Sequence, residues 1–329
     1  MSGDSLASSS YTMKGPLTYV TRDVSSSSPG KTELSNDSVA SLLNALMWYI
    51  TGKTAYAEKS VEILNAWANT LELLNGTDAQ LTASLYGAQL VNAAEIIRYT
   101  YSGWTADSIT TFEKMILDIF YPPASQTTPS DSQKYPFLAN WGTGGEKAIV
   151  AFGVFLSNET MYNYGLDLYH NFACANLNNT INSFGQNSES GRDQAHVQLG
   201  LGNMAETCQT AYNQGDNYWD LLESRLRVGY EYVASYNLGN TVKYDPHFYR
   251  CGADLVDGPW SNISDKERGV FRPIYEIAYG YFVQVKGSVM LYTQQVIQQH
   301  PIEANDGANN MGDSASYGTL RFSRVRGDV

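Results

Sequence analysis

Basic residues are scarce in this chain of 329 residues. Lys and Arg total 21 against 33 Asp and Glu, which gives a formal net charge of −12 and an isoelectric point near 4.7. Long-range repulsion by this charge opposes binding to nucleic acid or to an anionic membrane surface. We therefore expect neither as a partner.

Cysteine is also rare. The three residues Cys174, Cys208 and Cys251 allow either one disulfide with a thiol left over or three buried thiols. Their spacing fits no zinc template, and we expect neither a metal ion nor another cofactor.

The chain has no run of about 18 apolar residues, and its Ser-rich residues 1–15 lack the charged-then-apolar order of a signal peptide. We expect a soluble protein, and a monomer. Asn-x-Ser/Thr sequons, in a chain poor in Lys and rich in Tyr, favour a secreted, N-glycosylated protein whose signal was removed or replaced by Met1. The sequons begin at Asn36, Asn75, Asn158, Asn178 and Asn262.

Strand-like alternation is almost absent and is found only at residues 317–322. Apolar residues at helical spacing instead predict ten helices. They cover residues 37–52, 54–74, 82–101, 106–120, 144–156, 159–181, 192–214, 218–236, 269–285 and 289–298. We predict an all-α chain.

Helices joined alternately by short and long loops, without heptads, favour side-by-side helical hairpins, as in an (α/α) toroid or incomplete barrel. Residues 1–36 show no sustained period and are predicted to form an extended N-terminal segment, followed by a single domain over residues 37–329. In such a fold the long polar loops carry the site. These loops are residues 122–143, 183–191, 237–268 and 299–316.

His196 stands out among four histidines, because lone histidines such as His170 and His300 are more often structural. Arg192 precedes it by four residues, which on one helix would bring the two side chains together. A salt bridge of Arg192 with Glu189 or Asp193 is the alternative. Gly200 and Gly202, two costly residues inside a helix, indicate close packing or close approach of a ligand.

Two other segments carry suitable side chains. Asn140 and Trp141 end a long loop: the amide is a hydrogen-bond donor, and the indole offers a flat face to a sugar ring. Residues 243–252 gather cations and phenols, and we expect the cations to lower the pKa of a tyrosine there. The candidates in that loop are Lys243, Tyr244, His247, Tyr249 and Arg250.

Together these residues suit an elimination from a uronic acid residue. That reaction needs a group to neutralise the carboxylate, a base for the adjacent C–H proton and an acid for the departing oxygen. Seven stretches, in order, resemble the alginate-lyase-like superfamily of (α/α) toroid polysaccharide lyases. They are residues 43–52, 63–68, 92–98, 139–141, 189–196, 211–215 and 271–276.

The resemblance implies metal-independent β-elimination on a 1,4-linked polyuronate such as alginate or glucuronan, leaving a 4,5-unsaturated non-reducing end. It implies that Asn140, assisted by Arg192 or Arg272, neutralises the substrate carboxylate, and that His196 is the base or its partner. Tyr244 or Tyr249 would be the acid, or both acid and base. Ala195 departs from the glycine that the family often carries there.

The substrate groove would be lined by Trp141, Lys243, His247, Arg250 and Arg272, with an acidic polysaccharide as the partner. Such a groove must be locally cationic within an acidic body. Two alternatives stay open at this point. One is a glycoside hydrolase that uses two carboxylates on the same scaffold, and the other is a carbohydrate-binding protein without activity.

Overall fold

The computed structural model describes residues 1–23, 28–125, 139–172, 174–248, 258–303, 312–314 and 316–324. The chain divides into two compact units. Unit 1 comprises Met1–Ser130, Ala148–Tyr164 and Met311–Asp313, and unit 2 comprises Asp131–Lys147, Gly165–Asn310 and Ser314–Val329.

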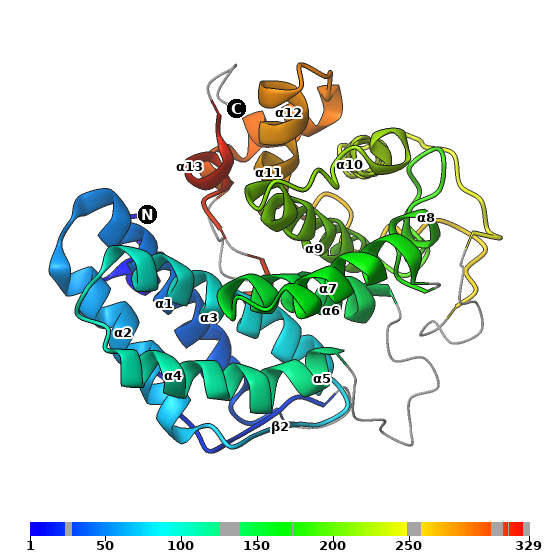
Figure 1. Cartoon of the computed structure of the whole chain (residues 1–329). Helices are drawn as coiled ribbons and strands as arrows, with labels where there is room; N and C mark the ends of the chain where they lie inside the picture. The colour runs from blue at the N-terminus through cyan, green and yellow to red at the C-terminus, as the bar shows by residue number, and fades with distance from the viewer. Residues whose placement is uncertain are drawn as a thin grey trace. The chain divides into compact units, whose positions relative to one another are not determined.

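Unit 1 is built on α1, which packs against α2 and α3 (Figure 1). Two short parallel strands pair Tyr19 with Leu73 and Thr21 with Asn75. The elements are η1 (Ser5–Ala7), β1 (Tyr19–Thr21), α1 (Lys31–Thr51), α2 (Thr54–Thr70), β2 (Leu73–Asn75), α3 (Ala79–Thr100), α4 (Ala106–Met115), the π-helical turn η2 (Ile116–Phe120) and α5 (Tyr121–Ser125).

Within unit 1, the N-terminal segment is held against α1 and α2 by the buried carboxylate of Asp37. Its oxygens accept hydrogen bonds from the Tyr11 hydroxyl at 2.8 Å, from the backbone of Lys14 and Gly15 at 2.9 Å, and from the Trp67 indole at 2.9 Å. A buried carboxylate is tolerated when hydrogen bonds satisfy it. The chain before α1 is therefore anchored although it has no regular period.

Unit 2 contains the later helices together with the first half of α6. Its elements are α6 (Ala139–Phe155) and α7 (Glu159–Asn171), both shared with unit 1, α8 (Leu177–Thr180), α9 (Gln194–Asn213), α10 (Leu221–Asn237), α11 (Tyr275–Tyr279), the π-helical turn η4 (Gly280–Val285), α12 (Leu291–Gln299), η5 (Pro301–Glu303) and α13 (Gly318–Phe322).

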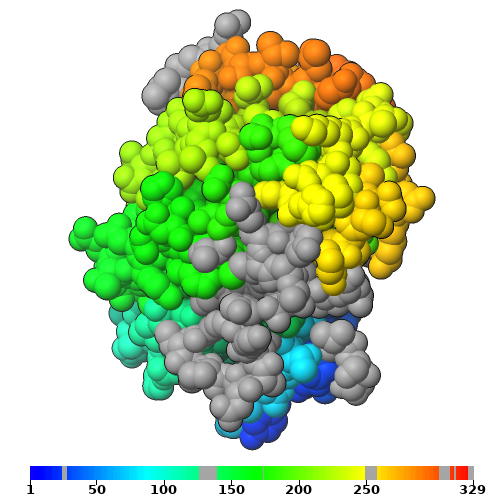
Figure 2. Space-filling view, turned by 90° about the vertical axis from the view of Figure 1, so that its right-hand side faces the viewer, coloured from blue at the N-terminus to red at the C-terminus, as the bar shows by residue number. Residues whose placement is uncertain are grey.

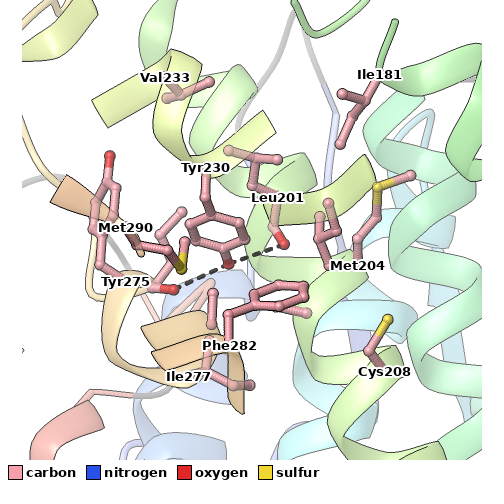
Figure 3. Close-up of a cluster of buried hydrophobic side chains, with 14 of the residues drawn as sticks. Ile181, Leu201, Met204, Cys208, Tyr230, Val233, Tyr275, Ile277, Phe282 and Met290 are labelled. Carbon is pink, nitrogen blue, oxygen red and sulfur yellow. Dashed lines mark hydrogen bonds between the residues drawn. The ribbon is translucent and has the colours of Figure 1, made fainter. Parts of the chain in front are cut away.

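Tyr230 of α10 lies at the centre of the unit 2 core (Figure 3). Its hydroxyl donates to the carbonyl oxygens of Leu201 in α9, at 3.2 Å, and of Ile274 before α11, at 3.0 Å. At Gly202 an added Cβ would lie 2.8 Å from Cγ2 of Ile274, so the close packing predicted for this glycine is confirmed. The core thus fixes residues 271–275 against α9.

The predicted all-α character is confirmed, with differences at particular elements. Residues 317–322, predicted as a strand, include helix α13, because a six-residue alternation is too short to be distinguished from a short helix. Helix α1 begins six residues before the predicted start, and α2 ends at Thr70, so that residues 73–74 of its predicted last turn belong to strand β2. No helix within the described ranges is long and apolar enough to cross a membrane.

Of the three cysteines, Cys174 is disulfide-bonded, while Cys251 lies outside the described residues. Cys208 is a free thiol inside unit 2, 3.2 Å from the Tyr169 hydroxyl. Burial raises the pKa of this thiol to about 12. It is therefore an un-ionised core residue at neutral pH.

Glu146 of α6 is a fully buried carboxyl group in unit 2. Neither of its oxygens has a hydrogen-bond partner among the described residues. Burial raises the pKa of this carboxyl well above its ordinary value. The folded protein therefore holds Glu146 in its neutral form more strongly than the unfolded chain does.

This difference predicts that Glu146 costs stability as the pH rises. The loss begins above the unfolded pKa of about 4.3 and amounts to about 1.4 kcal/mol per pH unit until the folded-state pKa is passed. Glu146→Gln removes the titration, so its unfolding free energy relative to wild type should increase through that window. Urea unfolding at several pH values measures it, with the exposed Glu58→Gln in α2 as control. A pH-independent difference would contradict the prediction.

Candidate active site

The first turn of α9 brings Asp193 and His196 together. Asp193 is the N-cap residue, and its Oδ1 accepts the backbone N–H of His196 at 2.8 Å. Both carboxylate oxygens also lie 2.8 Å from Nδ1 of the His196 ring. Asp is a preferred N-cap residue because its carboxylate can accept a backbone N–H from the first turn of the helix. This explains why a helix starts at Gln194.

The Asp193 carboxylate is ionised. Burial by itself would raise its pKa, but hydrogen bonds from the His196 ring and backbone, with the charges of His196 and Arg192, hold the pKa well below its usual value. Nζ of Lys266 lies 3.6 Å from Oδ2 and adds a further cation. The carboxylate side chain is 3% exposed, whereas the His196 side chain is 34% exposed.

The predicted meeting of Arg192 and His196 through i, i+4 spacing is wrong. Arg192 precedes α9 rather than lying on it, and its Nη1 donates to Oε1 of Glu189 at 2.8 Å. The alternative, a salt bridge with Glu189, is the arrangement observed. His196 has the carboxylate of Asp193 as its ring partner instead.

The anions and cations near the start of α9 differ in how far they are exposed to solvent. The carboxylates of Glu189 and Asp193 are 2% and 3% exposed, while the paired cations Arg192 and Lys266 are 28% and 67% exposed. The anions are thus turned inward and the cations outward. This gives the segment a cationic outer face within a chain of net charge −12.

Asn140, the second residue of α6, lies against the same turn. Its Nδ2 donates to the carbonyl oxygen of His196 at 2.9 Å, and its side chain is nearly buried. An added Cβ at Gly200 would lie 2.6 Å from Oδ1 of Asn140. Gly200 therefore permits the amide to approach α9, which confirms the close packing predicted there. Trp141 follows on α6 and is partly buried.

Tyr244 reaches the segment before α9 from the loop after α10. Its hydroxyl donates to the carbonyl oxygen of Trp260 at 2.9 Å. An added Cβ at Gly191 would lie 2.7 Å from this hydroxyl and 2.3 Å from Cβ of Trp260, so only glycine allows the approach. Burial, and then the charge of Asp245, raise the pKa of Tyr244, so the predicted lowering is wrong for this residue.

The loop that carries Tyr244 is fixed by Gln186. The Gln186 side chain accepts from the Asp245 backbone N–H at 2.7 Å and donates to its carbonyl at 2.9 Å. Lys243 is exposed, with Nζ 4.5 Å from the Phe184 ring centre, and His247 is exposed as well. The segment after α10, yellow in Figure 2, contributes to the surface of unit 2.

Tyr249 and Arg250 lie outside the described residues, so their predicted roles stay predictions. Arg272 lies next to Gln198 of α9, where its backbone N–H donates to Oε1 of Gln198 at 3.0 Å. It lines a cavity of about 290 Å³ in unit 2. The lining residues are Phe271, Arg272, Pro273, Tyr275, Val296, Ile297, Gln299, His300, Pro301 and Glu303.

Sequence reasoning missed Trp260 and Lys266 and considered Asp193 only as a possible salt-bridge partner of Arg192. The capping pattern before α9 was a signal for Asp193. Trp260 and Lys266 lie in a polar loop without a recognisable motif, so the sequence did not mark them as candidates. In the described part of the chain, no group of three or more His, Cys, Asp or Glu is arranged to hold a metal ion.

The fold resembles that of solved alginate lyases. An alginate lyase from Bacteroides ovatus matches with a TM-score of 0.60 at 15% identity, over 81% of this chain and 71% of that chain. Alginate lyase A1-III from Sphingomonas species A1 matches with a TM-score of 0.60 at 13% identity, over 94% of this chain and 82% of that chain. A histidine-to-alanine variant of A1-III complexed with tetrasaccharide gives 0.61 at 15%, over 91% and 78%.

These likenesses confirm the predicted (α/α) toroid fold class. No curated protein sequence matches the chain. The alginate lyase family pattern, however, matches residues 11–243, which is more than half of the sequence. The chain therefore belongs to the alginate lyase family and is a polysaccharide lyase.

Proposed function

We propose that the protein is a secreted lyase that cleaves a 1,4-linked polyuronate, either alginate or glucuronan, by metal-independent β-elimination. The product carries a 4,5-unsaturated sugar at its new non-reducing end. The observation that carries the proposal is the convergence of Asn140, His196 and Tyr244, from three separate segments, on the start of α9.

The carboxylate of the reacting uronate binds next to Asn140. One N–H of the amide is used at the His196 carbonyl, and the other N–H is available for a carboxylate oxygen. Arg192 or Arg272 supplies the positive charge. Arg192 has donors beyond the one bound to Glu189, since a guanidinium carries five N–H groups. Neutralising the carboxylate makes the adjacent C5–H acidic enough to lose its proton.

The proton at C5 passes to a base, the electron pair forms the C4–C5 double bond, and the C4–O bond breaks. An acid then protonates the departing glycosidic oxygen. His196 is the base or the partner of the base. Tyr244 is the acid: its raised pKa keeps the phenol protonated at neutral pH, as a proton donor must be. Tyr249 is the second candidate for that role.

The carboxylates that a glycoside hydrolase would use are engaged in other contacts, which favours a lyase. Paired catalytic carboxylates must face the glycosidic bond from two sides. Asp193 is bound to His196, and Glu206 lies 3.4 Å from Nζ of the buried Lys147. Oδ1 of Asp245 accepts the backbone N–H of His247 at 2.9 Å.

Secretion and N-glycosylation are supported by the exposure of the sequons. Asn75, Asn158, Asn178 and Asn262 are exposed, whereas Asn36 is partly buried within α1. Four of the five sequon asparagines are therefore accessible to a glycan-transferring enzyme.

The function is tested by mixing the protein with polymannuronate, polyguluronate, glucuronan and glycosaminoglycans. We expect the ultraviolet absorbance of a C4–C5 double bond conjugated to the carboxylate to rise with at least one of the first three. Adding a chelator should leave the rate unchanged. A gain in reducing sugar without ultraviolet absorbance would show hydrolysis and contradict the proposal.

Two conservative variants identify the acid. Tyr244→Phe removes the hydroxyl and leaves the ring, so we expect kcat to fall by about 100-fold to 10,000-fold if Tyr244 donates the proton. Tyr249→Phe should then reduce kcat by less than about 10-fold. The opposite ranking of the two variants would assign the role to Tyr249.

Gly200→Ala tests the position of Asn140. The new methyl group would displace the amide, and a shift of about 1 Å in a binding group can lower the rate by about 100-fold. Gly229→Ala is the matched control, because it places a methyl group inside α10 against Cδ1 of Ile181, away from the site. Equal kcat values for wild type and Gly200→Ala would argue against a role for Asn140.

A further inference from the structure

Asp193 makes more contacts to His196 than a helix cap requires. One carboxylate oxygen accepts the His196 backbone N–H, and both oxygens lie 2.8 Å from the ring nitrogen Nδ1. We propose that Asp193 is a positioning residue that holds the imidazole in its Nδ1–H tautomer, with Nε2 as the nitrogen that acts on the substrate. The proposal rests on the role of His196 proposed above.

The tautomer follows from the charge of the carboxylate. The low pKa of Asp193 means that it is ionised at neutral pH, and an ionised carboxylate can only accept hydrogen bonds. The hydrogen of the bond to His196 must therefore belong to Nδ1. A neutral imidazole protonated at Nδ1 has its lone pair at Nε2.

The orientation follows from burial. The Asp193 side chain is 3% exposed and the His196 side chain 34% exposed, so the ring edge at Nδ1 faces the interior and the opposite edge faces outward. Because the cap bond also fixes the Asp193 side chain, the position of the ring is set before substrate binds. Preorganisation of this kind lowers the cost of reaching the reactive geometry.

The surrounding charges complete the arrangement. Arg192 and Lys266 face the Asp193 carboxylate, and Glu189 faces Arg192. When Nε2 takes the C5 proton, the imidazole becomes a cation whose Nδ1–H points at an anion 2.8 Å away. Asp193 then stabilises that imidazolium without receiving the proton itself.

Asp193→Asn is the decisive variant. An Asn side-chain oxygen still caps α9, so the fold should persist, but its amide can donate a hydrogen to Nδ1 and favour the Nε2–H tautomer. We expect kcat to fall by about 100-fold or more, with KM changed by less than about 3-fold. The melting temperature should fall by no more than about 4 °C. Asp220→Asn, at the start of α10, is the matched control for activity.

The tautomer is read from the ring nitrogen chemical shifts of the ¹⁵N-labelled protein, in which four histidines give signals and His196→Ala identifies the relevant one. Wild type should show protonated Nδ1, and Asp193→Asn should gain the Nε2–H form. Glu189→Gln, which removes a neighbouring buried anion bound to Arg192, should leave the tautomer unchanged.

Asp193→Asn with full kcat, or with low kcat and an unchanged tautomer, would overturn the proposal. Because the nitrogen shifts need no substrate, they separate this proposal from the proposed function. If no polyuronate is cleaved but wild type still shows Nδ1–H and the variant loses it, the function fails while the positioning by Asp193 stands. If the substrate is cleaved and His196→Ala is fully active, the assigned role of His196 fails.

Discussion

The carboxylate of Asp193 joins three parts of unit 2 at one point. It caps the first turn of α9, binds the ring of His196 and lies 3.6 Å from Nζ of Lys266. A buried carboxylate without such partners would destabilise the fold, so the helix start and the loop with Lys266 must be correctly placed for the anion to be tolerated. The conformation of His196 is therefore set by the same interactions that stabilise this end of α9.

Two buried glutamines extend this constraint along the helix. The Gln194 backbone N–H and side-chain amide donate to the carbonyls of Lys266 and Ser264, respectively. Gln198 donates to the carbonyls of Gln194 and Val270 and accepts from the Arg272 backbone and the Tyr275 hydroxyl. With both donors and its acceptor oxygen in use, Gln198 holds residues 270–275 in one register against α9. The position of the cavity that Arg272 lines is thus fixed relative to α9, the helix that carries His196.

The features that depend on the local order of residues could be predicted from the sequence. Helical periodicity indicates the all-α class, and the residue types at 140, 196 and 244 indicate the chemistry before any geometry is known. Contacts between distant segments are not encoded in this way. The approach of Tyr244 to Gly191 depends on how a loop folds, and that of Asn140 to Gly200 depends on how α6 packs against α9. Helix spacing suggested Arg192 as the neighbour of His196, but the helix begins two residues later, because Asp193 rather than Arg192 is able to cap it.

The acidic composition is compatible with the acidic substrate proposed above, because charge repulsion and direct contact act over different distances. At physiological ionic strength the Debye length is about 8 Å, so acids spread over the rest of the surface are largely screened from a bound polyuronate. Contact with the partly exposed side chain of Arg192 and the exposed side chain of Lys266 is screened far less. Their partners Glu189 and Asp193 are only 2% and 3% exposed, so they hold the cations in place while remaining out of reach of the substrate. Binding of a polyanion then depends on a few well-placed cations and not on the net charge.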